Sequence, residues 1–360
     1  MLRPMQRTAF LSSITILAAS AAISMSTEVD RDKVETTRLL ALGGEGFSIH
    51  RTDHFLIASD SNADRVYPLA DRLETTYLAV GRFCEEMKLP IPPLPRKLPV
   101  LIFNRHSDFE RYAHKVGFHD PVAPGFYHPQ DNTVAFCNLL DFPKLRAISL
   151  KIEQAEMLPD SHAMREQIKQ WRSQRDAIIE TFNRLVIQHE AAHQIWFNIG
   201  VLSREVEYPT WLVEGLACQF EVSSQDDVNQ MRLADFREAL GVAPDAKAIE
   251  EASLSDAKAA KRFLSLEELV ADEEFDVADE NWRRFQYSQA WALVAYLSRT
   301  RRQAIKDYLR SISEHKNAEH SYRGQRIAQF ESIFGSIDQK FERSWIDYVL
   351  DLPLNPQDGR

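Results

Sequence analysis

Hydrophobic residues in the first third of the chain follow two periods, one typical of strands and one typical of helices. An alternating run at 54–59 and a short apolar run at 99–103 predict strands, and a stripe at helical spacing predicts a helix over 65–87. A shorter helix is predicted over 107–116. Residues 125–137 place a polar turn between two short apolar runs, which predicts a β-hairpin. The pattern therefore indicates a small mixed α/β lobe with a hairpin at the edge of its sheet.

From Leu145 the spacing of apolar residues is helical nearly to the end of the chain. Residues 144–180 are highly charged and predict a helical insert with a break near Pro159. Residues 223–280 are acidic and poor in large apolar side chains, so we expect a peripheral segment there. Amphipathic stripes over 281–352 predict a C-terminal helical lobe.

These segments together predict an α+β protein. Residues 27–143 form the expected N-terminal α/β lobe, which begins with a polar leader over 27–45. A mainly α-helical lobe follows it. Residues 181–222 carry the two helices on which the candidate chemistry lies.

Residues 1–26 differ from the rest of the chain. Arg3 and Arg7 precede an apolar run rich in Ala and Ser, and the Ala-Ser-Ala at 19–21 resembles a cleavage site. This pattern is typical of a secretory signal peptide and predicts export to the periplasm or the cell exterior. An uncleaved membrane anchor is the alternative. We favour cleavage, with no stable membrane association afterwards, because the run is short and rich in Ser for a stable span.

Composition narrows the class of protein by exclusion. The 360 residues are 44% hydrophobic, which argues against a disordered or low-complexity chain. The net charge is −10, with 43 Lys and Arg against 53 Asp and Glu and no basic run, so we expect no nucleic-acid partner. Cys84, Cys137 and Cys218 are too few for a disulfide framework and form no C-x-x-C motif.

Residues 189–193 read His-Glu-Ala-Ala-His, which is an H-E-x-x-H motif. On a helix, His189 and His193 lie one turn apart at the centre of an apolar face, and Glu190 lies at its margin. A single buried His is usually a core residue bonded to a carbonyl. Two at this spacing each bury a polar nitrogen, and one cation can satisfy both. The motif therefore predicts a metal site; the alternative is a chance match in a plain α+β domain.

A third ligand decides which class of metal site is present. Metal sites with a third His place a Gly and that His three and six residues after the motif, where this chain has Trp196 and Ile199. The other option is a Glu on a following helix, and Glu214 supplies it. Glu205 and Glu207 are rival carboxylates, but they lie in a polar connector and we expect them to face solvent.

The helix expected to carry Glu214 has signals of its own. Thr210, directly after Pro209, is a suitable N-cap, which puts Glu214 in the first turn or just beyond it. Gly215 inside a helix costs up to about 1 kcal/mol. That cost is understandable if another helix approaches closely at this point.

The motif, followed by Glu214 within Trp-Leu-x-Glu-Gly-x-Ala, resembles the gluzincin metallopeptidases. Within that clan the chain looks closest to a domain-of-unknown-function family of secreted bacterial proteins with a peptidase-like domain. It also resembles the zinc aminopeptidases related to leukotriene A4 hydrolase. The resemblance implies a thermolysin-like catalytic domain with one Zn²⁺, held by the two motif histidines and Glu214. It also implies that Glu190 is the general base and that the substrate is a peptide or protein.

The aminopeptidase resemblance assigns two more residues. Glu221 matches an acid that orients a ligand His. Tyr287, in Phe-Gln-Tyr-Ser-Gln-Ala-Trp-Ala-Leu at 285–293, matches a Tyr that opens a helix and hydrogen-bonds the transition-state oxyanion. The alternatives are an exposed acid near a helix end and a core Tyr. Cys218 is interpreted as small packing near the site, and not as a ligand.

One departure from the aminopeptidases concerns the substrate. Their Gly-x-Met-Glu-Asn stretch, whose Glu binds the free amine, corresponds to Gly-Phe-Tyr-His-Pro at 125–129. The choice between endo- and exo-cleavage therefore stays open. The strand that carries Val134, Ala135 and Phe136 is expected to accept an extended peptide by edge pairing.

The sequence thus predicts an exported zinc metallopeptidase. The alternative is a catalytically silent or autoinhibited binding protein on the same fold, with its cleft blocked by the insert at 144–180.

Overall fold

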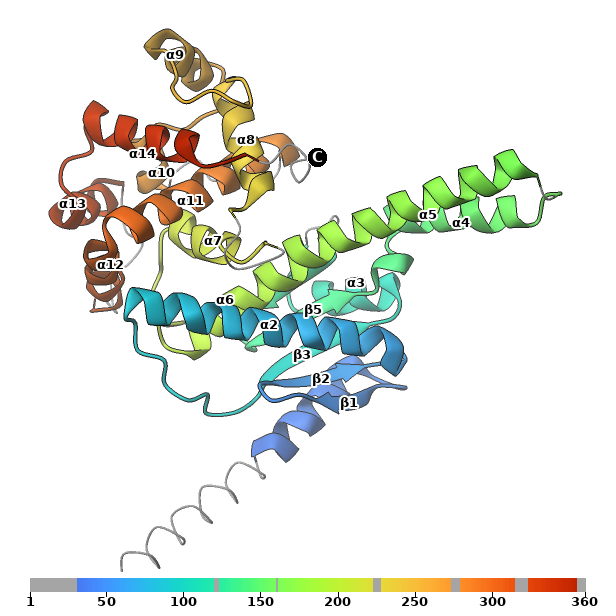
Figure 1. Ribbon diagram of the computed structural model, residues 1–360. Helices are drawn as coiled ribbons and strands as arrows, with labels where there is room; N and C mark the ends of the chain where they lie inside the picture. The colour runs from blue at the N-terminus through green and yellow to red at the C-terminus, as the bar shows by residue number, and fades with distance from the viewer. Residues whose placement is uncertain are drawn as a thin grey trace, which may run out of the picture.

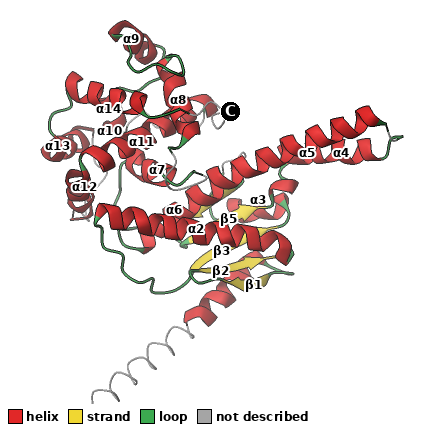
Figure 2. Cartoon of the chain, viewed as in Figure 1, coloured by secondary structure: helices red, strands yellow, loops and turns green. Residues whose placement is uncertain are grey.

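The computed structural model describes residues 31–119, 123–159, 161–222, 228–272, 279–314 and 323–354. The strands lie together in one part of the molecule and helices make up most of the rest (Figure 1 and Figure 2). This arrangement confirms the predicted α+β class. The predicted signal peptide at 1–26 lies outside the described residues.

A five-stranded mixed sheet forms the N-terminal lobe, with the strand order β1-β2-β3-β5-β4. The three central strands are parallel, and the two edge strands run antiparallel to their neighbours. The strands are β1 (Ser48–Arg51), β2 (Phe55–Ser59), β3 (Leu98–Phe103), β4 (Gly125–His128) and β5 (Thr133–Cys137). The two predicted strands and the hairpin are confirmed. The sequence does not predict β1, because its Ser-Ile-His-Arg contains a single apolar residue.

Helices cover both faces of the sheet, and each face has its own hydrophobic core. On one face lie α2 (Ala63–Met87) and α6 (His189–Asn198), and on the other lie α3 (His106–Lys115) and the helical residues 31–43. The short β2, β3 and β5 are buried along their whole length between these layers. Their continuous apolar runs, without polar alternation, follow from burial on both sides.

The first helix corrects one expectation. Residues 31–43 are helical, and Leu39 is fully buried against the sheet with Leu42 beside it. The prediction of a polar leader over 27–45 is therefore wrong for these residues. Leu39 and Leu42 pack this helix against the sheet. Two apolar residues in a short, mostly polar segment are too few to produce a recognisable helical pattern.

A helical pair projects from the body of the molecule. It consists of α4 (Pro143–Glu156) and α5 (His162–Phe182), so the predicted insert is helical, and it points away from both the sheet and the C-terminal helices (Figure 1). The short η1 (Leu139–Asp141) leads into it. From α5 the helical backbone continues through η2 (Asn183–Gln188), which has π-helical hydrogen bonding, directly into α6.

The C-terminal helices pack into a second lobe around Trp211 and Trp345, both fully buried. The lobe consists of α7 (Thr210–Cys218), α8 (Gln230–Leu240), α9 (Glu251–Ala259), α10 (Leu266–Ala271), α11 (Glu280–Thr300), α12 (Arg302–Glu314), α13 (Arg323–Phe334) and α14 (Gln339–Asp351). The peripheral character predicted for 223–280 is wrong for α10, where Leu266, Leu269 and Val270 are buried. It is also wrong for α8, because Leu233 and Phe236 are fully buried. The apolar residues of α8 are few and charged residues lie among them, so the sequence pattern does not reveal its buried face.

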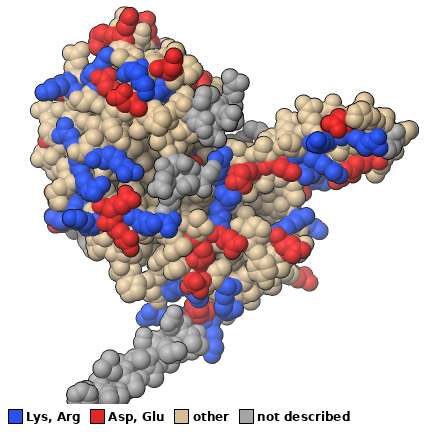
Figure 3. Space-filling model, in the orientation of Figure 1, with Lys and Arg blue, Asp and Glu red and all other residues tan. Residues whose placement is uncertain are grey.

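Two further observations concern the exterior. None of the described helices is both long and apolar enough to cross a membrane. On the face that Figure 3 shows, Lys and Arg side chains are interspersed with Asp and Glu. Charge of this mixed kind on that face differs from the clustered basic stripe of a nucleic-acid-binding surface.

Candidate metal centre

The motif helix α6 is anchored by two amide side chains, one directly before its first residue and one near its middle. Gln188, at the end of η2, donates from Nε2 to the carbonyl oxygens of Phe220 and Val222, 2.8 and 3.1 Å away. Gln194 donates to two carbonyl oxygens at the amino ends of β3 and β5, 2.9 and 2.8 Å away. The π-helical turn of η2 leads directly into the motif, and such turns recur at functional sites. The motif is therefore held between the sheet and the segment that follows α7.

The helix α7 brings Glu214 to the motif because it packs very close to α11. A Cβ on Gly215 would lie 2.4 Å from the carbonyl oxygen of Ala290 and 2.6 Å from Val294 Cγ2, so this position must be Gly. The helix begins at Thr210, so Thr210 is not the N-cap that the sequence predicts. Instead its backbone N and Oγ1 donate to Oδ2 of Asp272, at 2.8 and 3.0 Å.

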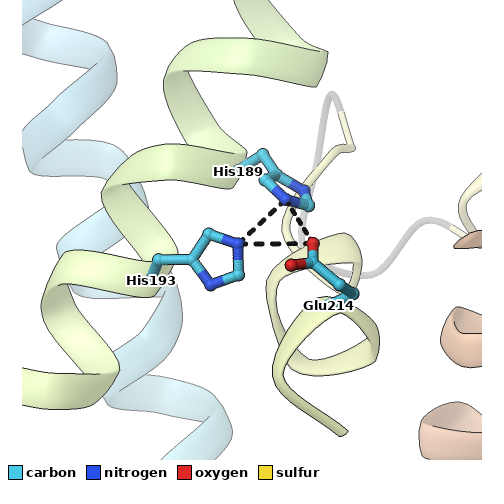
Figure 4. Close-up of side chains that lie close together, drawn as sticks. All are labelled: His189, His193 and Glu214. Carbon is cyan, nitrogen blue, oxygen red and sulfur yellow. Dashed lines mark hydrogen bonds and ion pairs between the residues drawn. The ribbon is translucent and has the colours of Figure 1, made fainter. Parts of the chain in front are cut away.

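Three side chains of α6 and α7 point at one another (Figure 4). Nε2 of His189 lies 3.0 Å from Nε2 of His193 and 3.0 Å from Oε2 of Glu214, and the third distance is 3.4 Å. Ligand atoms bound at about 2.1 Å to a tetrahedral zinc lie roughly 3.4 Å from one another. Two imidazole nitrogens and one carboxylate oxygen are also the donor set that zinc accepts. The residues therefore fit a zinc ion in both spacing and chemistry.

The other nitrogen of His189 is held by Glu221. Oε1 of Glu221 lies 2.8 Å from Nδ1 of His189, and the carboxylate also accepts hydrogen bonds from Asn229 and Arg232. Burial opposes the charge of this carboxylate, but Arg232 and the hydrogen bond to His189 lower its pKa to about 2. An ionised carboxylate can only accept, so Nδ1 carries the hydrogen and Nε2 keeps its lone pair for a metal.

The charges of the cluster reinforce one another. Burial opposes ionisation of Glu214, but its contacts with His193 and His189 hold the pKa of that carboxyl far below its ordinary value. Burial likewise opposes the charge of His189, but hydrogen bonds with Cys218, Glu214 and Glu221 raise its pKa well above the ordinary value. The cluster is built to hold positive charge, and a metal ion competes with a proton for that position.

Glu190 lies outside the triangle of ligand atoms. Its Oε2 accepts a hydrogen bond of 2.8 Å from the backbone N–H of Tyr127 in β4. Burial raises the pKa of Glu190, and the neighbouring carboxylate of Glu214 adds to this, while the two histidines oppose it. A carboxylate with a raised pKa beside a metal site is suited to exchange protons near neutral pH.

The strand expected to bind the substrate at its edge is not the edge strand of the sheet. The strand β5, which carries Val134, Ala135 and Phe136, pairs with β3 on one side and β4 on the other, so it has no free edge. The prediction of edge pairing there is wrong, since strand order depends on pairings that a local pattern does not contain. The edge strand is β4. The bond from Cys137 N to Pro124 O sets the alternation, which turns the backbone groups of Gly125 and Tyr127 outward.

Tyr287 lies on α11, with its ring centroid 5.8 Å from that of His189. It is the eighth residue of the helix, so it does not open the helix as the resemblance implies. Its ring packs against the guanidinium of Arg232, whose carbon lies 5.3 Å from the ring centroid. Burial and the nearby carboxylates of Glu214 and Glu190 raise the pKa of Tyr287 well above its ordinary value. Its hydroxyl therefore stays protonated and able to donate.

The remaining candidates lie outside the ligand triangle. Glu207 pairs with Arg326 at 2.7 Å, and Glu205 is exposed. Cys218 Sγ lies 3.9 Å from Nδ1 of His189, on the opposite side of the ring from the triangle. Glu221 is only 4% exposed, so it is not the exposed acid of the alternative interpretation, although it lies beyond the end of α7.

Sequence reasoning misses three contributors to the site. Arg232 and Asn229 come from the segment expected to be peripheral, and the backbone N–H of Tyr127 comes from the hairpin. A buried Arg in an otherwise charged helix gives no local signal, because its partner Glu221 belongs to a different segment. The Asn before α8 is a visible N-cap signal, and it could have marked the start of that helix.

Comparisons with known proteins add one match. No curated protein and no solved structure matches the chain. Residues 184–319 match the family model described as "Protein of unknown function (DUF1570)". The matched range includes every side chain of the cluster from His189 to Tyr287. The chain is thus similar, over this range, to a family of unknown function, as one part of the resemblance implies.

Proposed function

We propose that this protein is a zinc-dependent hydrolase of peptide bonds, with one Zn²⁺ held by His189, His193 and Glu214. The observation that carries the proposal is the convergence of their three ligand atoms, 3.0, 3.0 and 3.4 Å apart, beside a carboxylate that is not part of the triangle. Three protein ligands leave one position open, as in catalytic zinc sites. Zinc held there would act as a Lewis acid and lower the pKa of a bound water to about 7.

Glu190 is the general base in this proposal. It follows His189 directly on the helix, so its carboxylate lies beside the metal position without entering it. Because burial raises its pKa, it accepts a proton from the attacking water and can return it to the leaving amine. The hydrogen bond from Tyr127 N–H fixes one of its oxygens and leaves the other for this exchange.

The substrate lies along β4 in this proposal, in place of β5. The outward backbone N–H and carbonyl of Gly125 and the carbonyl of Tyr127 can pair with an extended peptide, while the N–H of Tyr127 is taken by Glu190. Because Tyr127 N–H contacts Glu190, a peptide on this edge passes directly beside the base. Tyr287 approaches the same centre from α11, and its protonated hydroxyl is the proposed donor to the oxyanion.

The active form is favoured over an autoinhibited one. The segment expected to block the cleft is the pair α4 and α5, which points away from the body in Figure 1. A catalytically silent protein would also have no need for Glu190 beside an intact ligand set. Export through the leader at 1–26 belongs to the same proposal, so the substrates are peptides or proteins of the periplasm or cell exterior.

Glu190→Gln tests the proposal. The variant keeps the shape of the side chain but cannot take a proton, so it should bind one zinc per chain and lose peptide hydrolysis by a factor of at least about 100. Hydrolysis of an unstructured protein such as casein, and of fluorogenic peptide pools, is measured with a chelator and after zinc is added back. Wild-type activity should vanish with the chelator and return with zinc. A zinc-loaded Glu190→Gln protein with undiminished hydrolysis would refute the assignment.

A further inference from the structure

Four side chains at the candidate metal centre form a closed circuit of contacts, and Arg232 is the member that has no role yet, either in the reaction or in orienting a ligand. Its Nε and Nη2 atoms donate to different oxygens of Glu221, each at 2.8 Å, while its guanidinium lies against the ring of Tyr287. Glu221 holds Nδ1 of His189, whose ring lies beside that of Tyr287. One cation therefore contacts both the acid behind a ligand and the residue proposed for the oxyanion.

The guanidinium group suits both contacts. Two parallel N–H···O bonds fix the plane of a carboxylate, which an ammonium group, acting as a point charge, does not do. Once the plane of Glu221 is fixed, Oε1 can accept Nδ1–H of His189 from one direction only. The imidazole is then aimed so that Nε2 faces the other two ligand atoms. On the opposite side, attraction between the cation and the aromatic face holds the ring of Tyr287.

The first turn of α8 is organised around this contact. Asn229 caps the helix by accepting a bond from the backbone N–H of Arg232, and its amide donates to Glu221 at 3.1 Å. Arg232 is 8% exposed and Glu221 is 4% exposed, so each is the partner that compensates the other's buried charge.

A second buried arginine on α8, Arg237, makes contacts that differ from those of Arg232. It donates to the backbone carbonyl oxygens of Ala246 and Leu350, which are not part of the site. It joins α8 to the C-terminal segment, and among the described residues it makes no hydrogen bond or ion pair with the metal cluster. The two arginines therefore separate a role at the site from a role in the fold.

We propose that Arg232 is a positioning residue of the zinc site, which aims His189 through Glu221 and holds Tyr287 against the centre. This inference rests on the proposed function. Arg232 touches neither the metal position nor the substrate edge, so its effect reaches the reaction through these two neighbours.

The first test measures zinc affinity, which requires no catalysis. The variants are R232M, R232K and the control R237M, each checked for folding by circular dichroism, and the dissociation constant is measured by competition with a chromophoric chelator. We expect R232M and R232K to bind zinc about 10–100 times more weakly, as is usual when a group behind a metal ligand is lost. R237M should lower the melting temperature and leave zinc affinity within twofold of wild type. An R232M or R232K protein with wild-type zinc affinity would overturn the inference.

The second test uses Tyr287 as a reporter. In saturating zinc, R232M should lower kcat with little change in KM, because the displaced hydroxyl acts in the transition state. In the Y287F background the hydroxyl is already absent, so R232M should cost a smaller factor in kcat there. Equal factors in both backgrounds would show that Arg232 does not act through Tyr287.

The proposed function and the inference about Arg232 would be contradicted by different results. A wild-type protein that binds no zinc contradicts the proposed function. A wild-type protein that binds zinc and hydrolyses peptides, together with an R232M protein that does both equally well, contradicts the inference about Arg232 alone.

Discussion

At the scale of single residues, surroundings give two neighbouring acids opposite properties. Glu221 accepts hydrogen bonds from three side chains, including a bidentate Arg232, and its pKa is lowered to about 2. Glu190 accepts a single backbone N–H, and burial raises its pKa. The first is therefore a permanent acceptor that fixes a tautomer, and the second can gain and lose a proton.

Asp235, one turn beyond Arg232, provides a prediction about pH. Burial raises its pKa to about 6 from an ordinary 3.8, although Arg232 and Arg284 oppose the shift. The folded protein therefore binds this proton more tightly than the unfolded chain. Stability from this group is complete below about pH 4 and is lost as the pH rises through about 6.

The measurement compares wild type with Asp235→Asn by urea denaturation between pH 4 and pH 6. The difference in the free energy of unfolding should change by about 2 kcal/mol across this interval, with the variant gaining relative to wild type as the pH rises. Asp256→Asn, at an exposed position of α9, is the control and should run parallel to wild type. A constant difference for Asp235→Asn would contradict the predicted titration.

At the scale of elements, the close contact between α7 and α11 sets the position of Glu214. Gly215→Ala should destabilise the protein by about 1–3 kcal/mol, because the added methyl overlaps Ala290 and Val294 and pushes the helices apart. Zinc binding should weaken as well, since Glu214 moves with α7. Denaturation curves and a zinc titration measure the two effects.

The matched control is Gly324→Ala in α13. Nothing lies within 4 Å of a Cβ at that position, so the substitution should be neutral or stabilising by up to about 1 kcal/mol. If both variants had equal stability, the close packing of α7 and α11 would not be what requires Gly215.

Elements also show how much of the fold can be predicted from sequence. A strand-like pattern at 54–59 identifies β2, a continuous apolar run identifies β3, and a polar turn between two apolar runs identifies the hairpin. The helix at 31–43 and the strand β1 bury too few apolar side chains to be found in this way. The spacing of residues in the sequence does not predict the π-helical hydrogen bonding of η2. The strand order, which makes β4 an edge strand, depends on pairing between strands that are far apart in the sequence.

The same distinction applies to the site. His189 and His193 are predicted from their helical spacing, and Glu214 from its place on the next predicted helix, and both signals can be read directly from the sequence. Arg232 and the N–H of Tyr127 reach the site only when other elements pack against it. Local pattern therefore finds the ligand atoms, while the groups that orient them require the three-dimensional arrangement.

At the scale of the whole molecule, the two lobes meet at the cluster. The sheet lobe contributes β4 and supports α6, and the helical lobe contributes α7, α8 and α11. The projecting pair α4 and α5 lies outside this meeting point (Figure 1). Because the ligands come from both sides of the junction, zinc binding should also join the lobes, and added zinc should raise the melting temperature.

The most direct test of the central claim is an anomalous difference map, measured at the zinc absorption edge from crystals equilibrated with Zn²⁺. We expect one strong peak at about 2.0–2.2 Å from Nε2 of His189, Nε2 of His193 and Oε2 of Glu214. A map with no peak at this position, or with zinc bound at other residues only, would contradict this claim.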